Sequence, residues 1–186
     1  MLPLVLSPAG WVGADGNWSA FTLEVGTPPQ FFRVLPSTNS GEVWVPTIDG
    51  CSHLGTQYET NCAQTRGVNV GFQANLSSTW YSIGLYDLSS DQNLFNDSDT
   101  AEYGLDTVTL TASESLKCTI ENRTVAGFAL SDFWAGSIGL GIQSSSFSVS
   151  GNIASLLSSI HAQNMTPSLS YGYTAGAAYS KSLSKG

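Results

Sequence analysis

Hydroxyl groups are the most abundant side chains in this sequence that could carry chemistry, and two histidines are the candidate bases that could activate one of them. Ser and Thr together number 44 of 186 residues, whereas histidine occurs only as His53 and His161. A nucleophilic serine needs a base within hydrogen-bonding distance, often on a Gly-x-Ser-x-Gly turn, and no such turn occurs. We therefore expect His53 on a loop and His161 on a helix surface.

Three cysteines form a second set of reactive groups. Cys51 and Cys62 flank a polar, turn-rich stretch, which favours a local disulfide over the alternative of two free, buried thiols. Such a bond would stabilise the fold by about 2 to 4 kcal/mol. Cys118 is left over, which predicts a free thiol or a partner outside the chain. The spacing of Cys and His fits no metal-binding motif, so we expect no metal and no cofactor.

Charge and hydropathy exclude two classes of partner. The chain has six basic and fourteen acidic residues, a formal net charge of -8, and scattered Lys and Arg. Nucleic acids and anionic lipid surfaces require clustered positive charge, so we expect no nucleic-acid partner. No apolar stretch approaches the roughly 18 to 20 residues that span a bilayer, and we expect no membrane segment. The apolar opening, Leu2–Leu6, is shorter than the roughly 7 to 15 apolar residues of a signal peptide.

Export is nevertheless favoured by the asparagines. Five of the ten stand in Asn-x-Ser/Thr sequons, more than the roughly two or three that the Ser and Thr content alone would give. Pro167 follows the last sequon and weakens it. We interpret the excess as glycosylation of a secreted or cell-surface protein, with Ser/Thr richness as the alternative. The sequons begin at Asn17, Asn75, Asn96, Asn122 and Asn164.

The elements that must position these groups are mostly strands. Apolar and polar residues alternate in short runs separated by nineteen glycines and seven prolines, which is typical of an all-β fold of one domain over residues 1–186. Residues 89–100 are polar and acidic and lack periodicity, which predicts an exposed loop or the tip of a long hairpin. One helix is predicted over Ile153–Gln163, with Asn152 as its N-cap. The predicted strands are 21–25 and 31–35, which form a hairpin, and 43–45, 68–72, 107–111, 124–130 and 168–173.

Two stretches in this order carry a family resemblance. Residues 21–30 read FTLEVGTPPQ, and residues 34–46 read VLPSTNSGEVWVP. Together they resemble the N-terminal lobe of pepsin-like aspartic proteases, peptidase family A1, and most resemble divergent members from filamentous fungi. The resemblance implies the N-terminal lobe of a bilobal, all-β fold with one short helix.

Further segments follow in the order of that family. Cys51 and Cys62 match a small disulfide loop, residues 77–80 (SSTW) resemble its Ser-Ser-Thr-aromatic element, and Tyr103–Leu110 resembles the strand after the flap. Phe133–Gly141 resembles its Phe-Asp-Gly-Ile-Leu-Gly-Leu-Gly segment. The resemblance extends from about Trp11 to the end of the chain, and a second lobe is absent from this sequence.

The sequence departs from the family at the catalytic position. Counting back from Trp44, the Asp-Thr-Gly-Ser motif falls on Ser37, Thr38, Asn39 and Ser40, so the catalytic Asp is replaced by Ser37. The family uses two carboxylates, one from each lobe, that share a proton and activate water. A serine hydroxyl barely ionises and cannot act as that base.

Other acids offer no replacement. Asp97, Asp99 and Asp106 precede Ser or Thr, but none is followed by the glycine of the tight active-site turn, so we expect loop or strand-edge positions for them. The family's flap motif is not recognisable; the flap would lie near residues 94–99. Trp44 matches the cleft aromatic behind the flap, with core packing as the alternative.

These observations predict a secreted, pepsin-like protein without catalytic activity in this chain. One alternative is a fragment of a bilobal aspartic endopeptidase that hydrolyses peptide bonds at acidic pH. Another is a peptide-binding or wall-associated scaffold that uses the cleft. The expected partners are an extended peptide segment and either a missing second lobe or a second copy of the chain, because a lone lobe exposes apolar surface.

Overall fold

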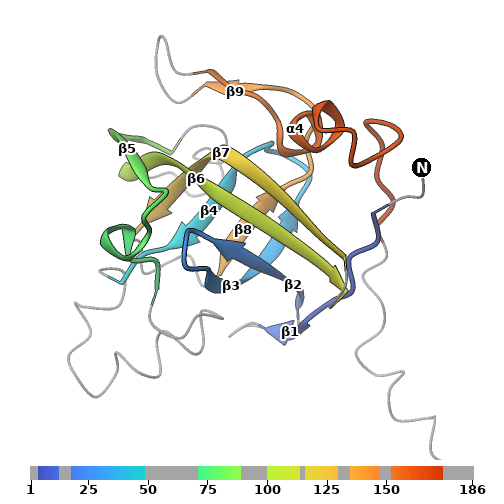
Figure 1. Ribbon diagram of the computed structural model, residues 1–186, viewed down its shortest axis with the longest axis horizontal. Helices are drawn as coiled ribbons and strands as arrows, with labels where there is room; N and C mark the ends of the chain where they lie inside the picture. The colour runs from blue at the N-terminus through green and yellow to red at the C-terminus, as the bar shows by residue number, and fades with distance from the viewer. Residues whose placement is uncertain are drawn as a thin grey trace, which may run out of the picture.

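The computed structural model describes residues 4–12, 18–48, 71–88, 100–113, 116–129, 135–146 and 152–173, and in these it confirms the all-β class. Strands dominate the described residues, and one short α-helix packs beside them (Figure 1). The elements in chain order are β1 (Gly10–Val12), β2 (Trp18–Val25), β3 (Gln30–Ser37), β4 (Val43–Pro46), the 3-10 turn η1 (Ala74–Leu76), β5 (Tyr81–Asp87), β6 (Thr100–Ser113), β7 (Leu116–Phe128), β8 (Gly136–Gly139), β9 (Ser145–Ser146), β10 (Asn152–Ile153) and α4 (Leu156–Ala162).

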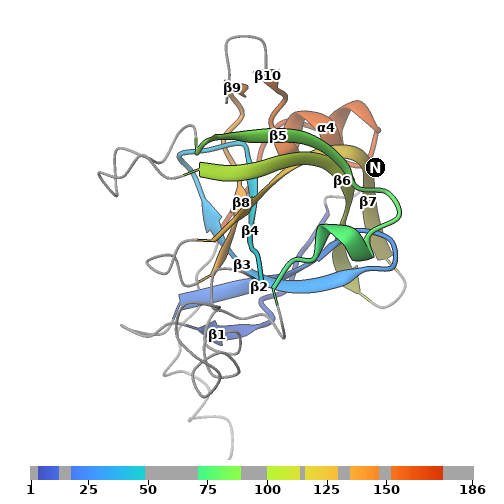
Figure 2. The ribbon, with the colours of Figure 1, turned by 90° about the vertical axis from the view of Figure 1, so that its left-hand side faces the viewer.

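Six of the strands close into a barrel. Strands β2, β3, β8, β4, β7 and β6 are neighbours in that order, and β2 also pairs with β6, which completes the ring (Figure 2). Strand β1 extends the sheet from β2, and β5 extends it from β6. The short strands β9 and β10 form a separate ribbon. Closure of the ring removes the free edges that an open sheet would present.

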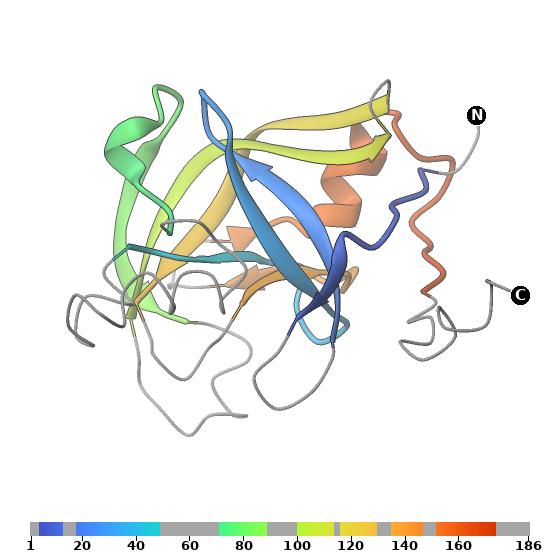
Figure 3. The ribbon, with the colours of Figure 1, turned by 90° about the horizontal axis from the view of Figure 1, so that it is seen from below.

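The predicted hairpin at the start of the barrel is confirmed. Strands β2 and β3 pair in antiparallel register from Phe21 opposite Val34 to Val25 opposite Gln30, around the turn at residues 26–29 (Figure 3). Leu23 is fully buried, as are Val25 and Val34. The alternation in the sequence therefore marked the residues that face the barrel interior.

Strand β4 is buried on both faces because one apolar cluster packs against each face. Val43 and Val45 belong to the barrel interior, whereas Trp44 between them belongs to a second cluster with Tyr103 and Phe128. Neighbouring residues of a strand point to opposite faces, so every residue of β4 is removed from water. This continuous apolar strand leads out of the loop that contains the candidate site.

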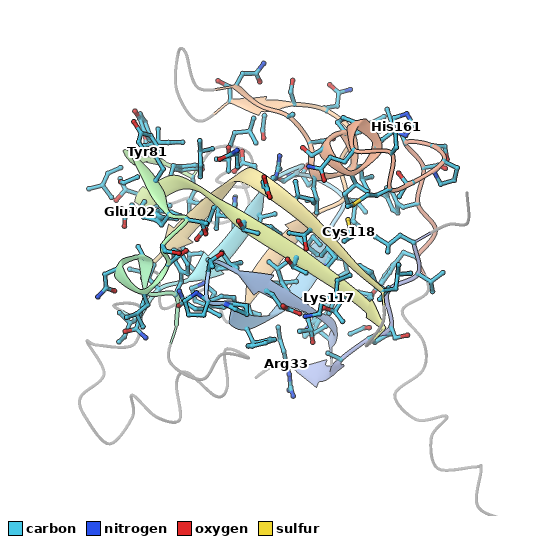
Figure 4. All side chains as sticks on the ribbon, viewed as in Figure 1. Arg33, Tyr81, Glu102, Lys117, Cys118 and His161 are labelled. Atoms are coloured by element: carbon cyan, nitrogen blue, oxygen red, sulfur yellow. The ribbon has the colours of Figure 1, made fainter. Side chains whose placement is uncertain are left out.

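A buried carboxylate lies on the outer side of β2. Glu24 is 5% exposed, and its Oε1 accepts hydrogen bonds from Thr111 Oγ1 (2.6 Å) and Lys117 Nζ (2.8 Å). Burial by itself raises the pKa of Glu24. The hydrogen bonds and the charge of Lys117, together with the hydrogen bond from Thr111, lower the pKa by more than burial raises it, so the pKa of Glu24 lies below its ordinary value of 4.5. Lys117 is labelled in Figure 4, where its side chain lies on the long β6–β7 hairpin.

Substituting Glu24→Gln should lower the free energy of unfolding at neutral pH by about 1 kcal/mol, since Lys117 is half-exposed and partly screened by water. A carboxyl group with a lowered folded-state pKa stabilises above its unfolded pKa, and the contribution is lost as the pH falls through the folded pKa. The difference from the parent should therefore shrink below about pH 4 in urea denaturation. The exposed carboxylate change Glu121→Gln is the matched control, and an effect of Glu24→Gln that persists unchanged in acid would contradict this role.

Asp106 is buried, contrary to the expected strand-edge position. It is 1% exposed, and its Oδ1 accepts hydrogen bonds from Thr79 Oγ1 (2.5 Å), Ser77 Oγ (3.0 Å) and Thr107 N (2.8 Å). Ser77 Oγ also accepts from the backbone N–H of Thr27 (3.1 Å) in the hairpin turn. The Ser-Ser-Thr element therefore joins the first hairpin to β6 through this carboxylate.

We expect Asp106→Ala to lower the free energy of unfolding by about 2 to 3 kcal/mol, because two hydroxyls and a backbone N–H would lose a charged acceptor in a buried position. Urea denaturation of the variant beside Asp87→Ala, an exposed carboxylate on β5, measures the difference. Equal stability of the two variants would show that the carboxylate does not hold the hairpin in place.

Two predicted elements differ in the structure. The helix begins at Leu156 and its N-cap is Ser155, whose Oγ accepts from Ser158 N (3.1 Å). Asn152 and Ile153 were expected in the helix and its cap, but they pair with β9 instead. Polar and apolar residues alternate over residues 168–173, as they would in a strand. In the structure this segment is irregular and pairs with no described strand. A strand needs a hydrogen-bonded neighbour as well as alternation.

The other predicted strands have mixed outcomes. Strands β4, β6 and β7 contain the predicted runs 43–45, 107–111 and 124–128, while Ala129 lies beyond the end of β7. Phe72 forms an isolated bridge to Thr47. Residues 68–70, 89–99 and 130 lie outside the described residues.

Candidate functional site

The end of β3 and the loop after it contain the four residues that the resemblance aligns with the family's catalytic motif, Ser37 to Ser40. Strand β3 ends at Ser37, which lies opposite Gly139 in the parallel pair that β3 forms with β8. The next strand, β4, runs antiparallel to β8, so the chain reverses between Ser37 and Val43 while both arms stay bound to the same strand. Thr38 and Asn39 are exposed at the tip of this reversal, and Ser37 is half-buried.

Backbone hydrogen bonds hold this loop on the segment that follows β8. Leu140 N donates to Ser37 O (2.7 Å), Gly141 N donates to Ser40 O (2.8 Å), and Gly139 N donates to Glu42 O (2.7 Å). A Cβ atom on Gly139 would lie 2.4 Å from Ser40 O, so only glycine allows the two segments to approach this closely. The loop position is therefore fixed by main-chain contacts.

Serine side chains make further contacts inside the loop. Ser37 Oγ accepts from Asn39 N (3.3 Å), and Ser40 Oγ accepts from Glu42 N (3.0 Å). Ser40 is 4% exposed, which places its hydroxyl inside the turn. The Ser40 hydroxyl therefore helps to hold the turn together from its buried side.

Arg123 ties the same loop to the helix. It is 3% exposed, its Nη2 donates to Gly41 O (2.6 Å), and its Nη1 donates to Ala154 O and Ser159 Oγ. Burial lowers the pKa of Arg123 to about 10, and the nearby carboxylate of Glu42 opposes part of that shift. A buried guanidinium at this pKa stays charged at neutral pH and holds two carbonyls of separate segments together.

Arg123 was not predicted as a buried site residue, because a bulge in β7 exchanges the inward and outward positions of the strand. Cys118 and Ile120 face inward, and after the bulge at residues 121–122 the inward positions are Arg123 and Val125. Asn122 has a positive φ of 51° at this bulge, a conformation that asparagine tolerates better than most residues. Asn122 is therefore a signal of the bulge in the sequence, although its sequon predicts only a glycosylation site.

Glu42 and Tyr103 were also missed. Glu42 is 2% exposed, and its Oε2 accepts from Trp44 Nε1 (2.8 Å) and Tyr103 Oη (3.3 Å). Trp44 is 2% exposed, so it packs in the second apolar cluster beneath the loop. Tyr86 of β5 contacts Tyr103 edge to face at a centroid distance of 6.1 Å. These aromatic rings support the inner side of the loop.

A cavity of about 720 Å³ lies against the exposed side of the loop. The loop forms one wall, and residues 140–146 and 169–171 form the others. Polar and apolar groups share the lining about equally: hydroxyl, amide and backbone groups lie beside the apolar side chains of Leu140, Ile142 and Leu169. The described residues of the lining include no carboxylate, histidine or cysteine, so none of these side chains could act as a carboxylate or imidazole base or as a thiolate nucleophile.

The remaining predicted site residues are spread over the surface or lie outside the described residues. Asn75 is exposed on η1, Asn122 on the β7 bulge, and Asn164 just after α4 with a φ of 55°. His161 lies on α4 as expected, with its Nδ1 3.2 Å from Thr166 O. The structure does not describe Asn17, Cys51, His53, Cys62, Asn96, Asp97 or Asp99.

Cys118 is free and buried. It is 2% exposed on β7, and its Sγ lies 2.9 Å from Met165 Sδ, below the segment that follows α4 (Figure 4). Burial raises the pKa of the Cys118 thiol, which lowers its reactivity.

Comparison with protein-family models gave no match, and neither did comparison with curated proteins. In the part of the chain that the structure describes, no helix is long and apolar enough to cross a bilayer. The same described residues contain no group of three His, Cys, Asp or Glu side chains that could hold a metal ion.

Replacing Arg123 with Met should lower the free energy of unfolding by about 3 kcal/mol, because the carbonyls of Gly41 and Ala154 would lose a charged donor in a buried position. Arg33→Met removes an equal charge from an exposed strand position and should change stability by less than about 0.5 kcal/mol. Urea denaturation of both variants measures the contrast. If Arg123→Met were as stable as Arg33→Met, the guanidinium would not be needed to join loop and helix.

Proposed function

We propose that this chain is a non-catalytic relative of the pepsin-like aspartic endopeptidases and that it binds an extended peptide segment in the cavity beside Thr38–Gly41. The observation that carries the proposal is the chemistry of this cavity. Ser37 directly precedes the lining residue Thr38 and stands where the resemblance aligns the catalytic Asp, and the described residues that line the cavity include no carboxylate. Peptide-bond hydrolysis by the family's mechanism needs a carboxylate that deprotonates water, and a serine hydroxyl cannot replace it.

The cavity has the groups that an extended peptide requires. Side-chain amides of Asn39 and Gln143 lie in its lining beside the serines of residues 144–146. Such neutral donors and acceptors suit the main chain of a peptide, which carries one N–H and one C=O per residue. Leu140 and Ile142 provide apolar contact for its side chains. The net charge of -8 disfavours acidic peptides and favours neutral or basic ones.

Export belongs to the same proposal. The exposed positions of Asn75, Asn122 and Asn164 support glycosylation, because a glycan needs an accessible asparagine. A disulfide between Cys51 and Cys62 would suit an oxidising compartment, and the buried Cys118 thiol is protected from one. We therefore propose a secreted or cell-surface location.

Association with a further lobe or a second copy is the remaining part of the proposal. Tyr81 and Leu85 on β5 are 69% and 72% exposed, and β5 is the last strand of the described sheet. A strand in that position with large exposed apolar side chains can pair with another chain. Tyr81 is labelled in Figure 4, where it points away from the barrel.

The test of function combines hydrolysis with binding. The purified chain and a Ser37→Asp variant are incubated with an unstructured fluorogenic peptide at acidic pH, with and without pepstatin. We expect no cleavage by the parent chain, because it lacks the base. Cleavage by the parent that pepstatin inhibits would refute the non-catalytic assignment.

Binding is measured in parallel against a panel of extended peptides, with mass spectrometry to verify that each peptide stays intact. Gln143→Trp fills the cavity and should weaken binding about tenfold or more. The matched control Gln163→Trp, at the exposed end of α4, should leave the affinity unchanged within about twofold. No saturable binding across the panel, or equal effects of the two variants, would refute the binding role.

A further inference from the structure

A second cavity, of about 660 Å³, lies beside the first and has a more apolar lining. The N-terminal segment 4–8 forms one wall, the segment 166–173 forms another, and α4 with the barrel strands forms the floor. In Figures 1 and 3 the N-terminal segment and the segment after α4 run beside one another next to the barrel. The two cavities adjoin, because Leu140, Ser170 and Tyr171 line both of them.

Specific contacts fix both walls to the barrel. Ala9 N donates to Ala20 O (2.7 Å), which anchors the N-terminal segment on β2. Met165 N donates to Ile160 O (3.1 Å), and the ring of Tyr173 lies 6.3 Å from the ring of Phe21. Leu4 and Leu6 pack against the barrel core from one side, and Met165 packs against it from the other. The cavity is therefore bounded by attached segments.

The lining is apolar at its base and carries hydroxyl groups near its mouth. Leu110, Ile138, Leu156 and Ile160 are buried residues at the base. Among the described residues of the lining, the polar side chains are the hydroxyls of Thr166, Ser168, Ser170, Tyr171 and Tyr173, and most of these residues are exposed. The same described residues include no Asp, Glu, Lys, Arg or His.

We propose that this cavity binds a neutral, largely apolar small molecule with a hydroxyl or ester group, of the type of a fatty alcohol or an alkyl ester. The volume falls in the range of roughly 300 to 1,000 Å³ that is usual for small-molecule sites, and such sites combine apolar walls with a few orienting polar groups. A charged ligand is disfavoured, since an ion buried here would lose its hydration without meeting an opposite charge. This proposal is independent of the proposed peptide-binding function.

The experiment titrates the full chain with N-phenyl-1-naphthylamine, a neutral fluorescent apolar probe, and displaces it with 1-dodecanol or with dodecanoate at neutral pH. We expect one saturable site per chain and displacement by the alcohol at an about tenfold lower concentration than by the carboxylate. Leu6→Asp places a charge in the wall and should weaken probe binding about tenfold or more. Leu116→Asp, at an exposed apolar position outside the cavity, should leave it unchanged within about twofold.

Thr166→Trp fills the same cavity without adding charge, and it decides the question if Leu6→Asp fails to fold. Peptide binding measured on these variants separates this proposal from the function of the first cavity. The proposed small-molecule site would be overturned by unsaturable probe binding, by equal displacement with alcohol and carboxylate, or by equal effects of the wall and control variants. A fourth result would also overturn it: sedimentation showing that the probe dissociates a dimer, because the occupant of the cavity would then be a second copy of the chain.

Discussion

The pairing of β2 with both β3 and β6 is the constraint on which the rest of the structure depends. Leu23 of β2 lies opposite Phe32 on one side and Leu110 on the other, so one strand completes the ring. Without the second pairing the six strands would form an open sheet with two exposed edges and a core covered on one side. The closed ring is what gives β3 and β8 fixed positions at the base of the candidate site.

The candidate site follows from that geometry with little help from its own side chains. Main-chain hydrogen bonds attach the loop 37–42 to β8 and to the residues after it, and Arg123 attaches it to the segment before α4. The side chain of Ser37 makes one long contact, within the loop itself. A loop held in this way can keep its shape when the residue at position 37 changes. Under the proposed relationship to the pepsin-like family, an exchange of Asp for Ser at this position would remove the base and leave the shape of the proposed binding surface in place.

The sequence predicted the parts of the fold that depend on local alternation and missed those that depend on a change of register. The first hairpin and the strand at 107–111 follow simple period-two patterns, the strand at 43–45 is a short continuous apolar run, and all of them are present. Arg123 escaped prediction because the bulge before it exchanges the two faces of β7. The helix begins at Leu156 and not at the predicted Ile153. Ile153 has helical spacing with Leu156, but it belongs to strand β10 and is buried in the second apolar cluster from there.

The contact between Cys118 and Met165 gives the molecule a built-in chemical reporter. The thiol lies under the segment that leads from α4 to Tyr173, and Met165 of that segment covers its sulfur. A soluble alkylating reagent can reach Cys118 only when this segment detaches from the barrel, so the labelling rate measures how often the segment detaches. Measured against denaturant, that rate would distinguish local detachment of the segment from global unfolding of the barrel, without any engineered probe.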